Sequence, residues 1–307
     1  MALHPFIVAM LEVLKKLPAL SSGTPAQGRA LVAAGRVRLG HGPALDLVQD
    51  IIVQGRAGDL HVRVLTPNAG PVGVIVFIHG GGWVLGALDD YDAYARSLAA
   101  RSGCVVVMVD YRLAPEHRFP AGLEDCEDAI SAVLQGKIAE IPQGPLVIMG
   151  DSAGANLATV CCARLVDRSA VALQVLYYPV TDADFSRGSY VRHGQGLPLT
   201  AADMLWFYTH YAPQDKWHDP AISPLRTADL HGMPPTILVT AEYDVLADEG
   251  AAYADHLRRA SVPVQLRGVT GVTHGFIRLH NLFDVADQEL STISSNIREA
   301  VTRDDKI

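Results

Sequence analysis

The chain has 307 residues, of which 49% are hydrophobic and 19% are charged, and its formal net charge is −8. The length suits one large domain or two small ones, and the composition can bury a large core, which excludes a disordered chain. The negative charge is a poor match for nucleic acid or an anionic membrane, both of which attract basic surfaces.

The four cysteines lie outside any CxxC pattern, so their spacing does not indicate a zinc site. They are Cys104, Cys126, Cys161 and Cys162. Buried, reduced thiols would agree with a cytoplasmic location, and a disulfide is the alternative. The sequence therefore predicts no metal centre.

The N-terminus predicts an amphipathic helix that ends near Pro18. It lacks a basic leader, and three charged residues interrupt its apolar run, which does not match a secretion signal. No stretch of the chain is long and apolar enough to span a bilayer, so we expect no stable membrane insertion. A helix on a membrane surface is the alternative, with only two lysines to attract it there. The apolar positions at helical spacing are Phe6, Ile7, Met10, Val13, Leu14 and Leu17.

Short β-rich runs alternate with helical patterns through most of the chain. Continuous apolar runs at residues 74–78 and 105–109 are typical of central parallel strands that are covered on both faces. The alternation predicts an α/β fold with a mostly parallel, doubly wound sheet and right-handed crossovers. In chain order we expect strands at residues 60–65, 74–78, 105–109, 146–149, 173–177, 236–240 and 264–267, and helices at residues 90–102, 122–135, 153–167, 201–211, 249–260 and 285–301.

Two regions do not follow this alternation, residues 1 to about 43 and about 184 to 220. The second is rich in aromatic residues, and aromatic insertions near a site usually line it. We expect both regions to form a cap over the active edge of one domain that spans residues 1–307; ordinary surface excursions are the alternative. Trp206, Phe207 and Tyr211 from this cap, with Trp83 and Asp151 from the sheet, are the candidate substrate-pocket residues.

The segment Gly150-Asp151-Ser152-Ala153-Gly154 follows a predicted strand and begins a predicted helix. A G-x-S-x-G pattern in this setting predicts a nucleophile elbow, with Ser152 on a strained turn at the positive end of the helix dipole. The alternative is a tight βα turn in which Ser152 only caps the helix. The strand–turn–helix setting favours the nucleophile.

A glycine run, His79-Gly80-Gly81-Gly82-Trp83, comes directly after the strand predicted at residues 74–78. A serine nucleophile needs preorganised donors for the tetrahedral oxyanion, and glycine leaves its backbone N–H unshielded. We expect the N–H groups of Gly81, Gly82 and Ala153 to form an oxyanion hole. A phosphate-binding turn is the alternative, but a Walker lysine and the Gly-x-Gly-x-x-Gly spacing are both missing.

The serine also needs a base and an acid that orients it. His274 follows the last predicted strand, and Asp244 follows the strand predicted at residues 236–240. The order Ser152, Asp244, His274 is the order expected for a triad on an α/β-hydrolase sheet. His280 is the weaker alternative for the base, and Glu242 and Asp248 compete for the acid.

These segments together resemble the hormone-sensitive-lipase-like carboxylesterases, of the type with the sequence Gly-Asp-Ser-Ala-Gly at the elbow. The resemblance covers about residues 60–276. It rests on the glycine run, residues 110–116 (Asp-Tyr-Arg-Leu-Ala-Pro-Glu), the elbow, Tyr178-Pro179, Asp244 with residues 246–250, and His274-Gly275-Phe276. Val245 stands where the family usually has proline, and Ala155 where it usually has glycine. In residues 110–116 we expect Arg112 and Glu116 to pair, as part of the floor of the site.

The resemblance implies an α/β-hydrolase fold of about eight strands with helices on both faces and a helical cap. It also implies hydrolysis of short- to medium-chain acyl esters through an acyl-enzyme, without a cofactor, and a possible homodimer. The alternatives are a non-catalytic binding protein on this fold, a scaffold protein, and an amidase, lactonase or true lipase. The expected partner is a small ester and not a nucleic acid.

Overall fold

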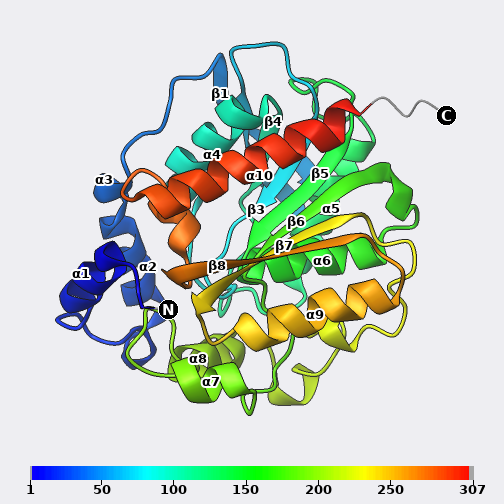
Figure 1. Ribbon diagram of the computed structural model, residues 1–307. Coiled ribbons are helices and arrows are strands. Elements are labelled where there is room, and N and C mark those ends of the chain that lie inside the picture. Colours follow the sequence, from blue (N-terminus) through cyan, green and yellow to red (C-terminus); the bar gives the residue numbers. More distant parts are fainter. Residues whose placement is uncertain (1, 304–307) are drawn as a thin grey trace.

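The computed structural model describes residues 2–303 and is built around one eight-stranded sheet (Figure 1). The strand order is β1-β2-β4-β3-β5-β6-β7-β8, and the six strands from β4 to β8 in this order run parallel. β2 pairs antiparallel with both β4 and β1. The strands are β1 (Leu47–Gly55), β2 (Gly58–Thr66), β3 (Val74–Ile78), β4 (Val105–Val109), β5 (Leu146–Asp151), β6 (Val171–Tyr177), β7 (Thr236–Tyr243) and β8 (Val264–Thr273).

Helices cover both faces of the sheet, as predicted. α4 (Leu88–Ser102) and α10 (Asp284–Thr302) pack on one face, and α5 (Ala121–Leu134), α6 (Ala153–Arg164) and α9 (Ala247–Arg259) pack on the other (Figure 1). Every residue of β3, β4 and β5 is buried, because each of these strands has a helix layer on both sides. This double cover explains their continuous apolar runs.

The N-terminal segment and a segment after β6 lie at the carboxyl ends of the parallel strands (Figure 1). The first contains α1 (Pro5–Leu14), η1 (Leu20–Ser22), α2 (Pro25–Ala34) and α3 (Arg36–Leu39), and the second contains α7 (Gly188–His193), α8 (Ala201–Tyr211) and η3 (Gln214–Lys216). The backbone N–H of Ser21 donates to Asp203 Oδ1 at 2.9 Å, which joins the two segments. The remaining short helices are η2 (Arg168–Ala170), η4 (Pro224–Arg226) and η5 (Phe276–Leu279).

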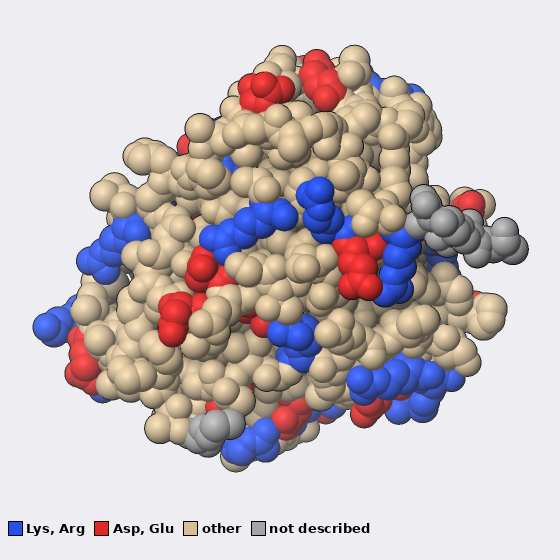
Figure 2. Space-filling view, turned by 45° about the horizontal axis from the view of Figure 1, so that its top comes forward, with Lys and Arg blue, Asp and Glu red and all other residues tan. Residues whose placement is uncertain are grey.

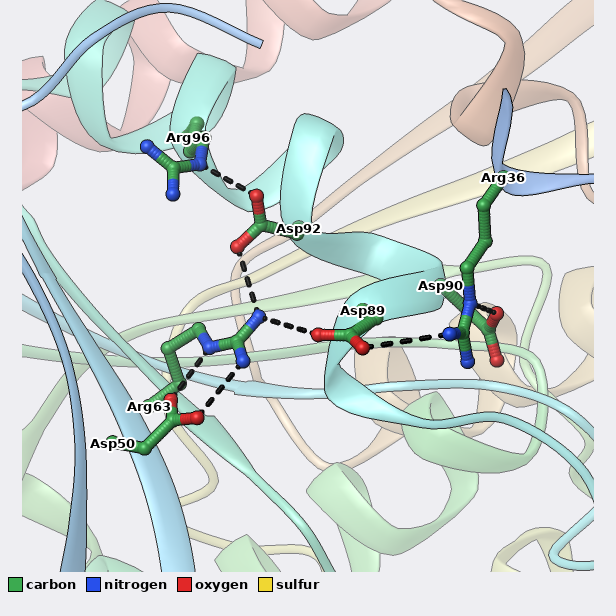
Figure 3. A network of polar contacts seen from close by, with 7 residues as sticks. All are labelled: Arg36, Asp50, Arg63, Asp89, Asp90, Asp92 and Arg96. Carbon is green, nitrogen blue, oxygen red and sulfur yellow. Dashed lines mark hydrogen bonds and ion pairs between the residues drawn. The ribbon is translucent and has the colours of Figure 1, made fainter. Parts of the chain in front are cut away.

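Two arginines fasten the N-terminal segment to the sheet domain. Arg29 donates to the backbone oxygens of Val84 and Ala114 and forms a bidentate ion pair with Glu116. Arg36 pairs with Asp90 and Asp89 at the start of α4. Figure 3 shows how the second contact continues into a network, because Asp89 also pairs with Arg63 of β2, which in turn binds Asp50 of β1 and Asp92 of α4.

The expectation for residues 110–116 was wrong in one respect. Arg112 pairs with Asp125 of α5, with Nε 2.8 Å from Oδ2, and Glu116 pairs with Arg29. Arg29 lies 87 residues away in the chain, so the short spacing between Arg112 and Glu116 was misleading. Strand β1 was also absent from the predicted elements. Only one of its nine residues, Val53, is fully buried, which leaves a weak apolar signal at this sheet edge.

Acidic and basic side chains alternate over the surface in Figure 2, without a large patch of one sign on the face shown. Within residues 2–303, no helix combines the length and the apolar character needed to cross a membrane.

Candidate active site

Ser152 stands on a sharp turn between β5 and α6, with φ 55° and ψ −120°. A positive φ is rare for a residue with a side chain, and such strain is concentrated at functional sites. No residue with a side chain fits at Gly150 or Gly154, because the surrounding backbone is too close. A Cβ on Gly150 would lie 2.5 Å from the backbone of Gly154, and a Cβ on Gly154 would lie 2.0 Å from the carbonyl oxygen of Ile78. The sequence therefore builds the strained turn that the pattern predicts.

Ser152, His274 and Asp244 come together at the carboxyl edge of the sheet, after β5, β8 and β7 respectively. His274 Nε2 lies 2.9 Å from Ser152 Oγ, and His274 Nδ1 lies 2.6 Å from Asp244 Oδ2. The other oxygen of Asp244 accepts a hydrogen bond from the backbone N–H of Leu246 at 2.9 Å. The Asp244 side chain is fully buried, and the His274 side chain is 12% exposed. The buried carboxylate therefore fixes the imidazole ring, and the other ring nitrogen faces Ser152.

The alternative candidates for the base (His280) and for the acid (Glu242 and Asp248) form hydrogen bonds with other residues. His280 is buried against α4, with Nε2 3.0 Å from Ser97 Oγ, and burial lowers its pKa to about 4. The Glu242 carboxylate accepts a hydrogen bond from the backbone N–H of Gly271 and so joins the ends of β7 and β8. Asp248 lies in the first turn of α9 and accepts hydrogen bonds from Ser189 and Arg192. None of these hydrogen bonds involves Ser152.

The glycine run after β3 lies beside Ser152. The backbone N–H groups of Gly81 and Gly82 donate no hydrogen bond to any residue in the described range 2–303. Both glycines have a positive φ, of 115° and 61°, which a side chain would strain. Ala153 is the first residue of α6, where the helix leaves its N–H groups unpaired. Three backbone donors are thus available around the serine.

Buried polar contacts hold the glycine run in place. The N–H of Gly80 donates to Asp151 Oδ1 at 2.7 Å, and Tyr91 donates to the other oxygen at 3.3 Å. Tyr111 donates to the carbonyl oxygen of His79 at 2.9 Å. Burial raises the pKa of the Asp151 carboxyl to about 6, and the charge of Arg278 is the largest opposing effect. Asp151 therefore supports the glycine run through buried hydrogen bonds.

A model of the α/β hydrolase fold family matches residues 75–278. The chain belongs to this family. An ethyl acetate hydrolase of Pseudomonas putida is 35% identical to it over 97% of this chain and 99% of the relative. Carboxylesterase NlhH of Mycobacterium tuberculosis is 39% identical over 71% of this chain and 72% of the relative.

Solved structures of esterases are also similar to this chain. A hyperthermophilic esterase from the archaeon Pyrobaculum calidifontis superposes on this α/β hydrolase with a TM-score of 0.92, at 35% identity over 97% of this chain and 99% of the other. The structure of a mutant of esterase rPPE bound to (S)-Ac-CPA gives a TM-score of 0.93 at 29% identity, over 99% of both chains. The comparisons confirm the family resemblance, the fold and the assignment as a carboxylesterase that the sequence predicted.

A cavity of about 150 Å³, called the serine cavity below, opens above Ser152 and His274 in this α/β hydrolase. Asp151 and Phe207, two of the five predicted pocket residues, line it together with Gly81 and Gly82. The sequence interpretation missed the other lining residues, which come from η1, α4, the segment directly after β6, the cap, and the segment after β8 that includes η5. They are Leu20, Tyr91, Val180, Pro198, Leu199, Met204, Gly275 and Arg278.

Trp83, Trp206 and Tyr211 were expected in the pocket, and the structure places them outside the lining of the serine cavity. Trp83 is only 1% exposed, and its ring stacks on Tyr211 with centroids 4.2 Å apart and planes 4° apart. Trp206 packs on the ring of His210 at 4.3 Å. Trp83 and Tyr211 thus pack on each other, whereas Trp206 packs on Phe207 and His210 within α8. The sequence shows that these rings lie near the site but not which way they point.

Proposed function

We propose that the protein hydrolyses carboxylic esters with short to medium acyl chains, with Ser152 as nucleophile. The observation that carries this proposal is the position of His274, whose two ring nitrogens are within hydrogen-bond distance of Ser152 Oγ and Asp244 Oδ2. A base that touches both the nucleophile and an orienting carboxylate is the arrangement required for covalent catalysis of acyl transfer.

The chemistry proceeds in two halves. Ser152 Oγ attacks the ester carbonyl carbon while His274 Nε2 takes the hydroxyl proton. The N–H groups of Gly81, Gly82 and Ala153 stabilise the oxyanion of the tetrahedral intermediate. His274 then gives the proton to the leaving alcohol, and an acyl-enzyme remains on Ser152.

In the second half the same histidine removes a proton from water, which attacks the acyl carbon. Collapse of the second tetrahedral intermediate releases the acid and returns the proton to Ser152 Oγ. Asp244 stays ionised throughout and stabilises the imidazolium that forms twice in each turnover. Every step uses side chains and backbone groups of this chain.

The size of the serine cavity supports a preference for small acyl groups. A buried apolar cavity of 150 Å³ in another protein admits benzene, so about six carbon atoms fill such a space. The serine cavity has about this volume. The name of the Pseudomonas putida relative, an ethyl acetate hydrolase, is consistent with small substrates.

We also propose that residues 1 to about 43 and 184 to 220 act as one cap on a single domain. Leu20 from the first segment and Leu199, Met204 and Phe207 from the second line the same cavity, which supports this grouping. A homodimer and a cytoplasmic location remain proposals as well. The four cysteines are free and buried, which favours a reducing compartment.

The test is hydrolysis of 4-nitrophenyl esters from acetate to dodecanoate by the purified protein. We expect the highest kcat/KM between acetate and octanoate and a decline for longer chains. Matched 4-nitroanilides and lactones measure the competing amidase and lactonase activities, which we expect to be lower. No hydrolysis of any ester from acetate to octanoate would contradict the proposal and would favour a binding or scaffold protein instead.

A further inference from the structure

A second cavity lies next to the serine cavity, beneath the N-terminal helices. Its volume is about 700 Å³, and we call it the N-terminal cavity. Most of its wall consists of apolar side chains from α1 and α2, among them Met10, Leu14 and Leu31. An alkyl chain that reached it would be buried against aliphatic groups, which is favourable because apolar surface is removed from water.

Two residues line both cavities, Gly275 and Arg278. Glycine has no side chain, so the Arg278 side chain is the one that stands between the two spaces. Arg278 belongs to η5, one helical turn beyond His274. Among residues 2–303, Arg278 is therefore the one residue whose side chain belongs to the linings of both the serine cavity and the N-terminal cavity.

Arg278 is held in this position from the sheet domain. Its Nη2 donates to the backbone oxygen of Asp90 at 3.1 Å, and its guanidinium carbon lies 4.6 Å from the ring centroid of Tyr91. The Asp90 carboxylate itself is occupied by Arg36 (Figure 3). Among residues 2–303, no carboxylate forms an ion pair with Arg278, and its Nε is buried without a partner.

These contacts make Arg278 a polar barrier to an apolar chain. An alkyl group that passed it would have to lie against a charged group and shield it from water, which is unfavourable. His274, which is followed by Gly275, gives its proton to the leaving alcohol in the proposed mechanism. The alcohol part of the ester therefore lies on the side of the cavity where Arg278 stands.

We propose that Arg278 limits the length of the alcohol part of the ester, because it closes the passage from the serine cavity to the N-terminal cavity. The inference rests on the proposed esterase function and names the residue that sets one side of its specificity. Removal of the guanidinium would join the two cavities and admit longer alcohols, without a comparable effect on the acyl part.

The test compares kcat/KM for ethyl, butyl, hexyl and octyl acetate in the wild type, Arg278→Ala and Arg278→Met. In the wild type we expect kcat/KM to be lower for octyl acetate than for hexyl acetate. Arg278→Ala should raise the octyl-to-ethyl ratio by about 10-fold or more, a usual effect of added methylene contacts in an apolar pocket. Arg278→Met, which fills much of the same space without charge, should raise it by less.

Two controls separate this effect from a general disturbance. Arg101→Ala removes an exposed arginine, which joins α4 to α10 through Asp287 and Ser291, and should leave the ratio unchanged. The ratio of ethyl octanoate to ethyl acetate reports on the acyl side and should stay within about twofold in Arg278→Ala. Thermal unfolding of each variant shows whether it is folded.

An unchanged octyl-to-ethyl ratio in Arg278→Ala, with ethyl acetate still hydrolysed, would overturn the inference and leave the esterase function intact. If Arg278→Ala does not fold, the same criterion applies to Arg278→Met. If kcat/KM of the wild type were the same for all acetates from ethyl to octyl, this result alone would overturn the inference about Arg278. A wild type that hydrolyses none of the acetates would instead overturn the proposed function on which the inference rests.

Discussion

The loops at the sheet edge and the cap above them are built in different ways. At the sheet edge, Ser152, His274 and Asp244 each follow a buried parallel strand, and short contacts within the chain fix them. The two cap segments contain helices and no strand of the sheet, and side-chain contacts such as Arg29 with Glu116 and Ser21 with Asp203 hold them in place. The reacting groups are therefore positioned by the sheet itself, whereas the shape of the cavity depends on how two segments that are far apart in the sequence meet.

This difference has a consequence for mutations. Changes at the sheet edge should reduce the rate for every ester, because they alter the transition state that all esters share. Changes in the cap should alter the relative rates for different esters, because they alter the space around the variable parts of the substrate. The following substitutions test this division, from the largest expected effect to the smallest.

Asp244→Asn should lower kcat by about 10⁴-fold, the loss found when the aspartate of another serine triad was replaced by asparagine. The amide cannot stabilise the imidazolium and favours the wrong tautomer of His274. The matched control is Asp248→Asn in the first turn of α9, because the Asp248 carboxylate accepts hydrogen bonds from Ser189 and Arg192. Steady-state kinetics with 4-nitrophenyl butyrate measures both. A loss of less than tenfold in Asp244→Asn would argue against its assignment as the triad acid.

Gly82→Ala should lower kcat by about 10²–10³-fold, the usual cost of one oxyanion donor. The new Cβ would lie 2.1 Å from the ring of Phe207, on a backbone with φ 61°, so the loop would have to move. Gly196→Ala is the control, since Gly196 has φ 75° but no atom within 4 Å of a Cβ. If both variants lost activity equally, backbone strain and not donor position would explain the loss.

Asp151→Asn tests the buried carboxyl that supports the glycine run, through the pH dependence of the free energy of unfolding. Burial raises the folded-state pKa of Asp151 to about 6 from a usual 3.8. The folded state therefore holds this proton more tightly than the unfolded state, and the stabilisation is present below pH 4 and lost as pH rises through 6.

Between pH 4 and pH 8, the free energy of unfolding of the wild type should fall relative to that of Asp151→Asn by up to about 3 kcal/mol. Urea unfolding at several pH values measures this difference. A constant difference between the two proteins across that range would contradict the raised pKa of Asp151.

The smallest effect is expected for the pair Phe207→Ala and Trp206→Ala. The two residues are neighbours on α8, and of the two only Phe207 lines the serine cavity. Phe207→Ala should change the ratio of kcat/KM for butyrate and octanoate esters by about tenfold. Trp206→Ala should leave that ratio within about twofold. Equal effects on the ratio would show that Trp206 contributes to the pocket, as the sequence had indicated.

The same division explains how far the sequence could predict the structure. The strands at residues 74–78 and 105–109 were predicted with their observed bounds, because burial on both faces produces continuous apolar runs. The elbow was recognisable because Gly150 and Gly154 are each required by a close backbone contact. Both signals are local, and a local signal can be read without knowledge of the fold.

The cavity walls could not be predicted in the same way. Leu20 reaches the serine cavity from an N-terminal turn that has no catalytic motif, and Arg278 is one of many arginines in the chain. Tyr211 was expected in the pocket but stacks on Trp83 in the core. Aromatic content showed that this region lies near the site, but the direction of each ring depends on packing between segments that are far apart in the sequence.

The most direct test of the central claim is the reaction of wild type and Ser152→Ala with 4-nitrophenyl butyrate. We predict that the wild type hydrolyses it and is acylated at Ser152, detected as a butyryl mass increase on the peptide that contains this residue. In Ser152→Ala kcat should fall by about 10⁶-fold, the loss known for removal of a triad serine, with no acylated peptide. Hydrolysis by Ser152→Ala at the wild-type rate would contradict the assignment of Ser152 as the nucleophile.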